Sequence, residues 1–144
     1  MSAGDALSGV VRFYETISPA TLEAELKTIY AADAFFKDPF NEVRGLVPIT
    51  AIFTHMFEQV DNPRFVVSTH VAQGAQAFLT WDFRFAMKRF SQAPQCIRGA
   101  THLVFDDQGL VSMHRDYWDA AEELYEKLPV LGGLMRWLKR SANR

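Results

Sequence analysis

The apolar positions in the first part of the chain repeat with the period of an amphipathic helix. This pattern predicts helices over residues 5–18, 22–30 and 45–60. Thr21 stands where its hydroxyl group can cap the second helix. Between the second and third helices, residues 35–38 form a short apolar run that we expect to be a strand. The N-terminal part is therefore expected to be mainly helical.

From residue 64 onward, apolar and polar positions alternate, which is typical of strands. The alternation predicts four strands, at residues 64–72, 77–89, 95–106 and 110–118. Glycine-containing turn sequences separate the first from the second strand and the third from the fourth. The strands that these turns connect are expected to be antiparallel neighbours.

This order of elements indicates an α+β fold, in which about three N-terminal helices cover the concave face of a strongly curved, mostly antiparallel sheet. Such an arrangement can enclose a cone-shaped hollow. A length of 144 residues fits a single domain over residues 1–144. We expect its core to span residues 5–118 and a C-terminal helical extension, with helices at 120–128 and 131–140, to span residues 119–144.

The composition excludes several classes of protein. A formal net charge of -2 gives no global field that would attract nucleic acid. The one cysteine, Cys96, excludes an internal disulfide and a cysteine-rich metal site. No apolar run approaches the ~20 residues of a membrane span, and the N-terminus lacks the regions of a signal peptide, so we expect a cytoplasmic protein. Aromatic residues make up 13% of the chain, which fits either a large core or the lining of an apolar cavity.

The carboxylate of Asp38 is the first candidate for chemistry, because Asp38 precedes Pro39 at the end of an apolar run. Proline disfavours helical geometry in the residue before it and cannot continue a sheet ladder. Asp38 is therefore expected at a rigid junction between strand and loop. There it can point into a cavity and act as a base, or it can close a turn by accepting hydrogen bonds from nearby amides.

Four segments carry a resemblance to a known family. They are Val11-Arg12-Phe13-Tyr14, the stretch from Tyr30 to Asp38-Pro39 with Gly45, the hairpin 101–111 and the run His114-Arg115-Asp116-Tyr117-Trp118-Asp119. Together with the order of elements, they resemble the nuclear-transport-factor-2-like superfamily, in its SnoaL-like and ketosteroid-isomerase-like branch. The C-terminal stretch looks like that of bacterial members. This superfamily hosts isomerases, cyclases, hydrolases, binding subunits and transport factors, so the resemblance implies a fold and no single activity.

The ketosteroid isomerases of this superfamily imply one set of roles. The carboxylate that matches Asp38 removes a proton next to a ketone, and a tyrosine at the position of Tyr14 donates to the oxyanion. Where those enzymes hold a neutral aspartic acid, this chain has Thr101, which is a weaker donor. The substitution favours a different reaction, or binding without catalysis.

Limonene-epoxide hydrolases imply a second set of roles. Their last strand ends in a run similar to residues 115–119, and its aspartate belongs to an Asp-Arg-Asp set that activates water and protonates the epoxide. Asp116 matches that aspartate. The other two members should appear as Arg-x-Asp on an earlier strand, whereas this chain has Asp82-Phe83-Arg84 in the reverse order. We expect Asp82 and Arg84 to form cross-strand or subunit ion pairs.

Strand alternation groups candidate residues independently of the resemblance. His114, Asp116 and Trp118 share one face of the last strand, and Thr101 and Leu103 share one face of its neighbour. If both faces line the hollow, Asp116 and His114 lie in an aromatic-rich pocket, where they can share a proton with a ligand or water.

Two interpretations of these residues remain open. In the first, the catalytic residues are Asp38, Tyr14, Asp116 and His114, and the pocket walls bind the substrate through Trp81, Thr101, Leu103, Trp118 and Phe53. In the second, Asp116 bonds Tyr14 or a helix amide, and His114 is a hydrogen-bonded core residue. The first describes an enzyme that acts on a small hydrophobic, oxygen-bearing molecule. The second describes a noncatalytic module that binds such a molecule or a partner protein.

The remaining patterns concern cofactors and partners. The chain has neither the His and carboxylate spacing of a metal site nor a Gly-rich phosphate loop, so we expect no metal and no cofactor. The basic, apolar tail after Pro129 can lie on a membrane surface, but Gly132-Gly133 weakens it as a helix and favours packing across the pocket mouth or against a partner. The resemblance implies a homodimer formed through the open sheet face.

Overall fold

The computed structural model describes residues 3–88 and 93–123. Its elements, in chain order, are two helices, two strands, a third helix, a run of four strands and a short helix. They are α1 (Ala3–Glu15), α2 (Leu22–Ile29), β1 (Tyr30–Lys37), β2 (Glu42–Arg44), α3 (Leu46–Gln59), β3 (Val60–Gln73), β4 (Gln76–Met87), β5 (Pro94–Phe105), β6 (Val111–Tyr117) and α4 (Ala120–Glu123).

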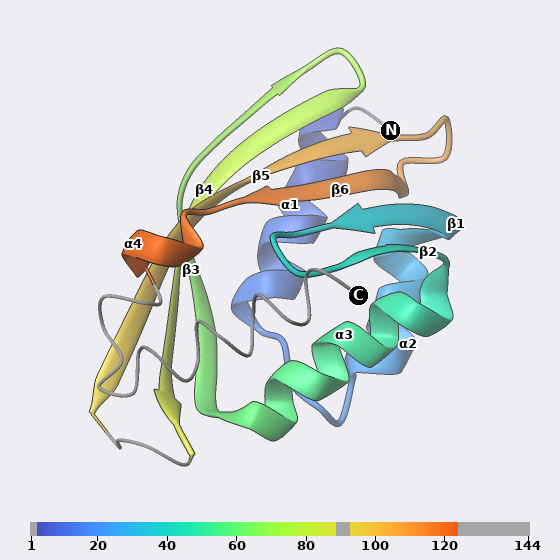
Figure 1. Cartoon of the computed structure of the whole chain (residues 1–144). Coiled ribbons are helices and arrows are strands. Elements are labelled where there is room, and N and C mark those ends of the chain that lie inside the picture. Colours follow the sequence, from blue (N-terminus) through green and yellow to red (C-terminus); the bar gives the residue numbers. More distant parts are fainter. Residues whose placement is uncertain (1–2, 89–92, 124–144) are drawn as a thin grey trace.

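The strands form one curved sheet in the order β2-β1-β6-β5-β4-β3. Every pair of neighbours is antiparallel except β1 and β6, which are parallel. Helices α1, α2 and α3 lie on the concave side of this sheet (Figure 1). The α+β cone predicted from the sequence is therefore confirmed, including its mostly antiparallel sheet.

The helices bury the apolar stripes that predicted them. In α1, the buried side chains include Leu7, Val10 and Tyr14. In α3, Ile49 and Phe53 are buried, and Pro48 lies in the first turn, where its missing N–H is tolerated. These stripes and buried side chains of the strands form one hydrophobic cluster.

The segment before Asp38 differs from the prediction. The helix α2 ends at Ile29, and Tyr30 already has extended backbone angles, so β1 is twice as long as the short strand expected at residues 35–38. Strand β2 was not predicted, because a strand of three residues carries little alternation. Thr21 occupies the N-cap position of α2 but makes no capping hydrogen bond, since its hydroxyl group bonds that of Ser18 at 2.9 Å.

The two long hairpins follow the predicted turns. Gly74 and Gly109 have φ angles of 60° and 80°, which glycine adopts without strain. The strand expected to begin at residue 64 begins earlier, at Val60, because β3 continues through a bulge that contains Asn62, with φ 51°. Asp82 and Arg84 do form an ion pair, at 3.5 Å, but with each other along β4 and not across strands.

The predictions for the C-terminus fall mostly beyond the part that the structure describes. The expected helix at 120–128 is seen only as α4, and the expected helix at 131–140, with the basic tail, lies outside the described residues. Within residues 3–88 and 93–123, no helix is long and apolar enough to cross a membrane.

Candidate active site

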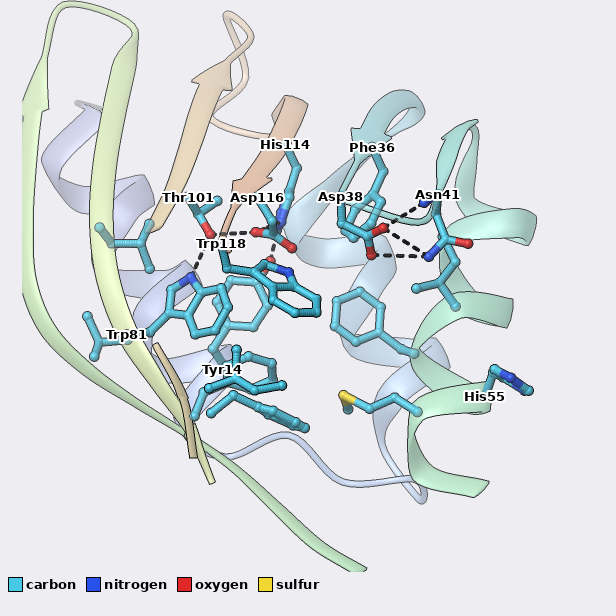
Figure 2. Close-up of a pocket in the computed structure, with 18 residues that line it drawn as sticks. Tyr14, Phe36, Asp38, Asn41, His55, Trp81, Thr101, His114, Asp116 and Trp118 are labelled. Atoms are coloured by element: carbon cyan, nitrogen blue, oxygen red, sulfur yellow. Dashed lines mark hydrogen bonds and ion pairs between the residues drawn. The ribbon is translucent and has the colours of Figure 1, made fainter. Parts of the chain in front are cut away.

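A cavity of about 250 Å³ opens between the concave face of the sheet and the helices (Figure 2). Its walls are mainly apolar and aromatic, from Phe36, Ile52, Phe53, Met56, Phe65, Val67, Leu79, Trp81, Phe83, Ile97 and Trp118. Its polar lining consists of Tyr14, Asp38, Asn41, His55, Thr101, His114 and Asp116. The volume is below the ~300–1,000 Å³ that is typical of sites for drug-sized ligands, which favours a small ligand.

The carboxylate of Asp38 closes a turn and also lines the cavity, so both interpretations of this residue hold together. Oδ1 accepts the backbone N–H groups of Phe40 at 2.8 Å and Asn41 at 2.7 Å. The side-chain amide of Asn41 lies 3.0 Å from Oδ1 and 3.1 Å from Oδ2. These bonds fix the direction of the carboxylate at the end of β1. Oδ2 accepts fewer hydrogen bonds from the described residues than Oδ1 does.

The carboxylate of Asp116 is held from the neighbouring strands. Oδ1 accepts the hydroxyl group of Thr101 at 2.6 Å and Nε2–H of His114 at 2.7 Å. Thr101 accepts in turn the indole N–H of Trp81 at 2.8 Å. This arrangement follows from register, because Thr101 is the partner of Asp116 in the β5–β6 pair. Both bonds of Asp116 to the part of the chain that the structure describes use Oδ1, so Oδ2 is available to a ligand.

Behind Asp116 lies a buried cluster of three aromatic side chains. The hydroxyl groups of Tyr14 and Tyr30 contact each other, and each lies 2.8 Å from Nδ1 of His114. Two hydroxyl hydrogens and one imidazole hydrogen all find acceptors when one tyrosine donates to the other, which donates to Nδ1, and Nε2–H donates to Asp116; the remaining tyrosine–Nδ1 contact holds no hydrogen. A second imidazole hydrogen, on Nδ1, would leave one hydroxyl hydrogen without an acceptor in this cluster. Hydrogen-bond counting therefore assigns His114 as the neutral Nε2–H tautomer.

Burial acts on the titratable groups of the cavity. It raises the pKa of Asp38, and the negative charge of Asp116 adds to this rise, while the bonds from Phe40 and Asn41 oppose it. Burial also raises the pKa of Tyr14 well above its usual value, with further contributions from Tyr30 and Asp116. Tyr14 therefore remains protonated, and Asp38 is a stronger base than an exposed aspartate.

The sequence-predicted site residues come together around the cavity with one exception. Tyr14, Asp38, His114 and Asp116 line it, as do Phe53, Trp81, Thr101 and Trp118. Leu103 shares the face of Thr101 but is fully buried in the core below, and it is not part of the lining. Asp82 and Arg84 do not line it either.

Sequence reasoning missed Tyr30 and Asn41. Helical spacing assigns Tyr30 to an apolar helix position, and only its hydroxyl group, which needs a partner when buried, gave a signal. Asn41 stands three residues after Asp38, which is the spacing at which an amide can close an aspartate turn. Among the described residues, no three His, Cys, Asp or Glu side chains converge as ligands for a metal ion.

The family is now clear from comparison with known proteins. Residues 10–114 match the model of the SnoaL-like domain, and the chain belongs to this family. Its fold is the cone of ketosteroid-isomerase-like and nuclear-transport-factor-2-like proteins. No curated protein sequence matches the chain.

Solved structures of similar shape have distant sequences, so they show the fold alone. One is a hypothetical protein with a ketosteroid isomerase-like fold from Catenulispora acidiphila, in complex with trimethylamine, with TM-score 0.71 and 15% identity over 83% of this chain and 89% of that chain. Another is a limonene-epoxide-hydrolase-like epoxide hydrolase from M. tuberculosis, with TM-score 0.68 and 16% identity over 96% of both chains. A third is a nuclear-transport-factor-2-like protein from Burkholderia thailandensis, with TM-score 0.72 and 12% identity over 100% of this chain and 98% of that chain.

Proposed function

We propose that this SnoaL-like protein is a cofactor-independent acid/base enzyme that acts on a small hydrophobic molecule bearing a carbonyl or epoxide oxygen. The observation that carries the proposal is the pair of carboxylates, Asp38 and Asp116, in one apolar cavity, where burial raises the pKa of Asp38 and the charge of Asp116 adds to the rise. A buried carboxyl group with a perturbed pKa beside a second carboxylate is a frequent sign of proton-transfer chemistry.

Asp38 is the proton acceptor in this proposal. Its carboxylate is aimed by the turn at Phe40 and Asn41, and Oδ2 is the oxygen left for the substrate. Abstraction of a proton next to a carbonyl transfers the C–H electron pair into an enolate and the proton to Oδ2. Return of that proton to another carbon completes an isomerisation. Alternatively, the enolate carbon attacks a second carbonyl, and delivery of the proton from Asp38 to the alkoxide that forms completes a cyclisation.

The developing negative oxygen needs a hydrogen-bond donor. The hydroxyl groups of Tyr14 and Thr101, which the sequence suggested for this role, are engaged with Tyr30, His114 and Asp116. The indole N–H of Trp118 has no partner in the described part of the chain, and Figure 2 shows this ring projecting into the cavity beside Asp116. We assign the role of oxygen donor to Trp118.

Asp116, held by His114, is a second group that can take part in proton transfer in this proposal. With Oδ1 fixed by Thr101 and His114, Oδ2 of Asp116 can accept a hydrogen bond from a substrate hydroxyl group or a water molecule. In an epoxide reaction, this geometry suits activation of water, with a protonated Asp38 as the acid that opens the ring. The name of the M. tuberculosis structure, an epoxide hydrolase, supports epoxides as one substrate class to test.

The test measures proton abstraction directly. Small cyclic ketones are incubated in heavy water, and the loss of their α-proton signals is followed by NMR, alongside ring opening of small epoxides. We expect turnover that falls by ~10²–10⁴-fold in Asp38→Asn. Asp107→Asn removes the same charge from an exposed turn and is expected to keep full activity. Equal rates in wild type and Asp38→Asn across the panel would refute the proposed base.

A noncatalytic binding module is the second candidate. The engagement of the Tyr14 and Thr101 hydroxyl groups favours it, because these bonds stabilise the fold and are not offered to a substrate. The complex of the Catenulispora protein with trimethylamine supports small-molecule binding by this fold. Ligand binding that Asp38→Asn leaves unchanged, with no turnover of ketones or epoxides, would establish this function.

A homodimer is the assembly that we propose. The outer face of the sheet exposes large apolar side chains, namely Val66, Val71, Phe78 and Tyr117. A second copy would remove this apolar surface from water. Sedimentation of wild type as a dimer, and of Phe78→Lys as a monomer, would support it. The cytoplasmic location stays a prediction of the sequence.

A further inference from the structure

The charged side chains that line the cavity, among the described residues, are mainly acidic. Its carboxylates are Asp38 and Asp116, and no lysine or arginine of residues 3–88 and 93–123 lines it. The histidines of the lining are His114, which hydrogen-bond counting assigns as neutral, and His55, which lies at the α3 side and pairs with Glu58 at 3.7 Å. The described residues of the lining therefore present more negative than positive charge to the contents of the cavity.

The hydrogen-bond donors to both carboxylates are also neutral. Asp38 accepts from two backbone amides and the side-chain amide of Asn41. Asp116 accepts from the Thr101 hydroxyl group and the His114 imidazole. Such donors solvate a carboxylate, but they do not neutralise it, and a buried charge without an opposite charge is costly.

In the described part of the chain, two cationic side chains next to lining residues are directed elsewhere. Lys37 and Arg115 are partners in the β1–β6 register, while their neighbours Phe36 and His114 line the cavity, so strand alternation places the two cations on the outer face. There, Lys37 lies 3.9 Å from Glu42, and the guanidinium of Arg115 lies 4.9 Å from the centre of the Tyr117 ring.

Aromatic rings line the cavity together with the two carboxylates. The rings of Tyr14, Phe36, Phe53, Phe65, Trp81, Phe83 and Trp118 line the cavity. An aromatic face carries a partial negative charge and attracts cations, most strongly where water is excluded. A cavity that holds two carboxylates and several aromatic rings therefore favours a compact organic cation over a neutral molecule of the same shape.

We propose that the natural ligand of this cavity carries a protonated or quaternary nitrogen, whose charge lies against Asp116 and Asp38 while its apolar groups contact the aromatic walls. The inference rests on the proposed function in one respect, since it takes the same cavity as the ligand site. A cationic substrate would also supply opposite charge to its own developing oxyanion, in addition to the hydrogen bond assigned to Trp118.

The test compares two probes of equal shape and different charge. Choline is the cation, and its carbon isostere, in which a tert-butyl group replaces the trimethylammonium group, is the neutral control. Binding is followed by the indole N–H signals of Trp81 and Trp118 in NMR titrations. We expect choline to bind at least about tenfold more tightly than the isostere, as expected for a desolvated cation–π contact assisted by ion pairing.

Two charge-removing variants assign this preference to the carboxylates. In Asp116→Asn and in Asp38→Asn, the affinity ratio of choline to isostere is expected to fall by about tenfold, while the isostere binds as before and shows that the cavity is intact. Asp107→Asn changes the net charge equally and is expected to keep the wild-type ratio. A ratio that is the same in all four proteins would overturn the role of the carboxylates.

The outcomes separate this inference from the proposed function. Tighter binding of the isostere than of choline, or no shift of either indole signal with choline, overturns the cationic ligand. Turnover of neutral ketones or epoxides would in that case still establish the enzyme. Conversely, a selective choline complex without turnover would support the cationic ligand and leave the protein as a binding module.

Discussion

The hydroxyl group of Thr101 donates a hydrogen bond of 2.6 Å to the carboxylate of Asp116 across the β5–β6 pair. The same hydroxyl oxygen accepts the indole N–H of Trp81 at 2.8 Å. Thr101 therefore joins an aromatic wall of the cavity to its carboxylate. Both of these hydrogen bonds are to other residues of the protein, so its hydroxyl group is engaged within the fold.

Replacing Thr101 tests this connection. Thr101→Val keeps the shape but leaves Asp116 without one donor and Trp81 without its acceptor, so we expect a loss of about 2–3 kcal/mol in the free energy of unfolding, measured with urea. Thr101→Ser keeps the hydroxyl group and is expected to lose less than about 1 kcal/mol. Equal losses in both variants would show that packing of the methyl group matters and the hydrogen bonds do not.

Tyr14 and Tyr30 are expected to substitute for each other. Each lies at hydrogen-bond distance from Nδ1 of His114, so either single change to phenylalanine leaves one donor and should cost about 1 kcal/mol of stability. The double variant leaves Nδ1 without a donor, and its loss should exceed the sum of the single losses by about 1 kcal/mol. Additive losses in the double-mutant cycle would contradict the assignment of Nδ1 as an acceptor.

The pKa of Asp38 should respond to Asp116. A nearby negative charge favours the protonated form of a carboxyl group, so Asp116→Asn removes one cause of the raised pKa. We expect the pKa of Asp38 to fall, and the acid limb of any rate dependent on this base to move to lower pH. Carbon-detected NMR titration of the Asp38 carboxyl group measures the shift. An unchanged pKa would mean that burial alone raises it.

Asn41 should act in the opposite direction. Its side-chain amide stabilises the ionised form of Asp38. Asn41→Ala removes that donor and keeps the backbone N–H bond, so the pKa of Asp38 is expected to rise further and the acid limb to move to higher pH. The same NMR titration measures it. A fall in the pKa would show that the substitution admits water to Asp38.

Gly99 controls the position of a cavity wall. A Cβ atom at this site would lie 2.5 Å from two ring atoms of Trp81, so Gly99→Ala must displace the indole. We expect a loss of about 1–3 kcal/mol of stability, together with weaker binding of any cavity ligand. Gly9→Ala is the matched control, because the nearest atom to the new Cβ outside its own helix is Cδ1 of Ile29, at 4.0 Å. Gly9 lies within the helix α1, where alanine is favoured over glycine. It should stabilise the protein by about 0.5–1 kcal/mol in the same unfolding experiment.

The sequence alone determined most of the architecture. Helical spacing in α1 and alternation in β3 to β6 reflect which side chains are buried, and the burial of apolar surface is the main driving force of folding. The turn at Gly109 was predictable because its backbone conformation favours glycine. The boundary at Tyr30 was not, because an apolar residue next to a helix fits the end of that helix or the start of a strand equally well.

The candidate site depended on tertiary structure. The sequence determined that Asp38 stands at a rigid junction and that His114, Asp116 and Trp118 share one face of a strand, because proline geometry and strand alternation are local. Only the fold decided that Thr101 lies opposite Asp116, that Tyr30 reaches His114, and that Leu103 stays in the core. These relations join segments far apart in the chain, and they depend on strand register and on how closely the helices approach the sheet, which no local pattern specifies.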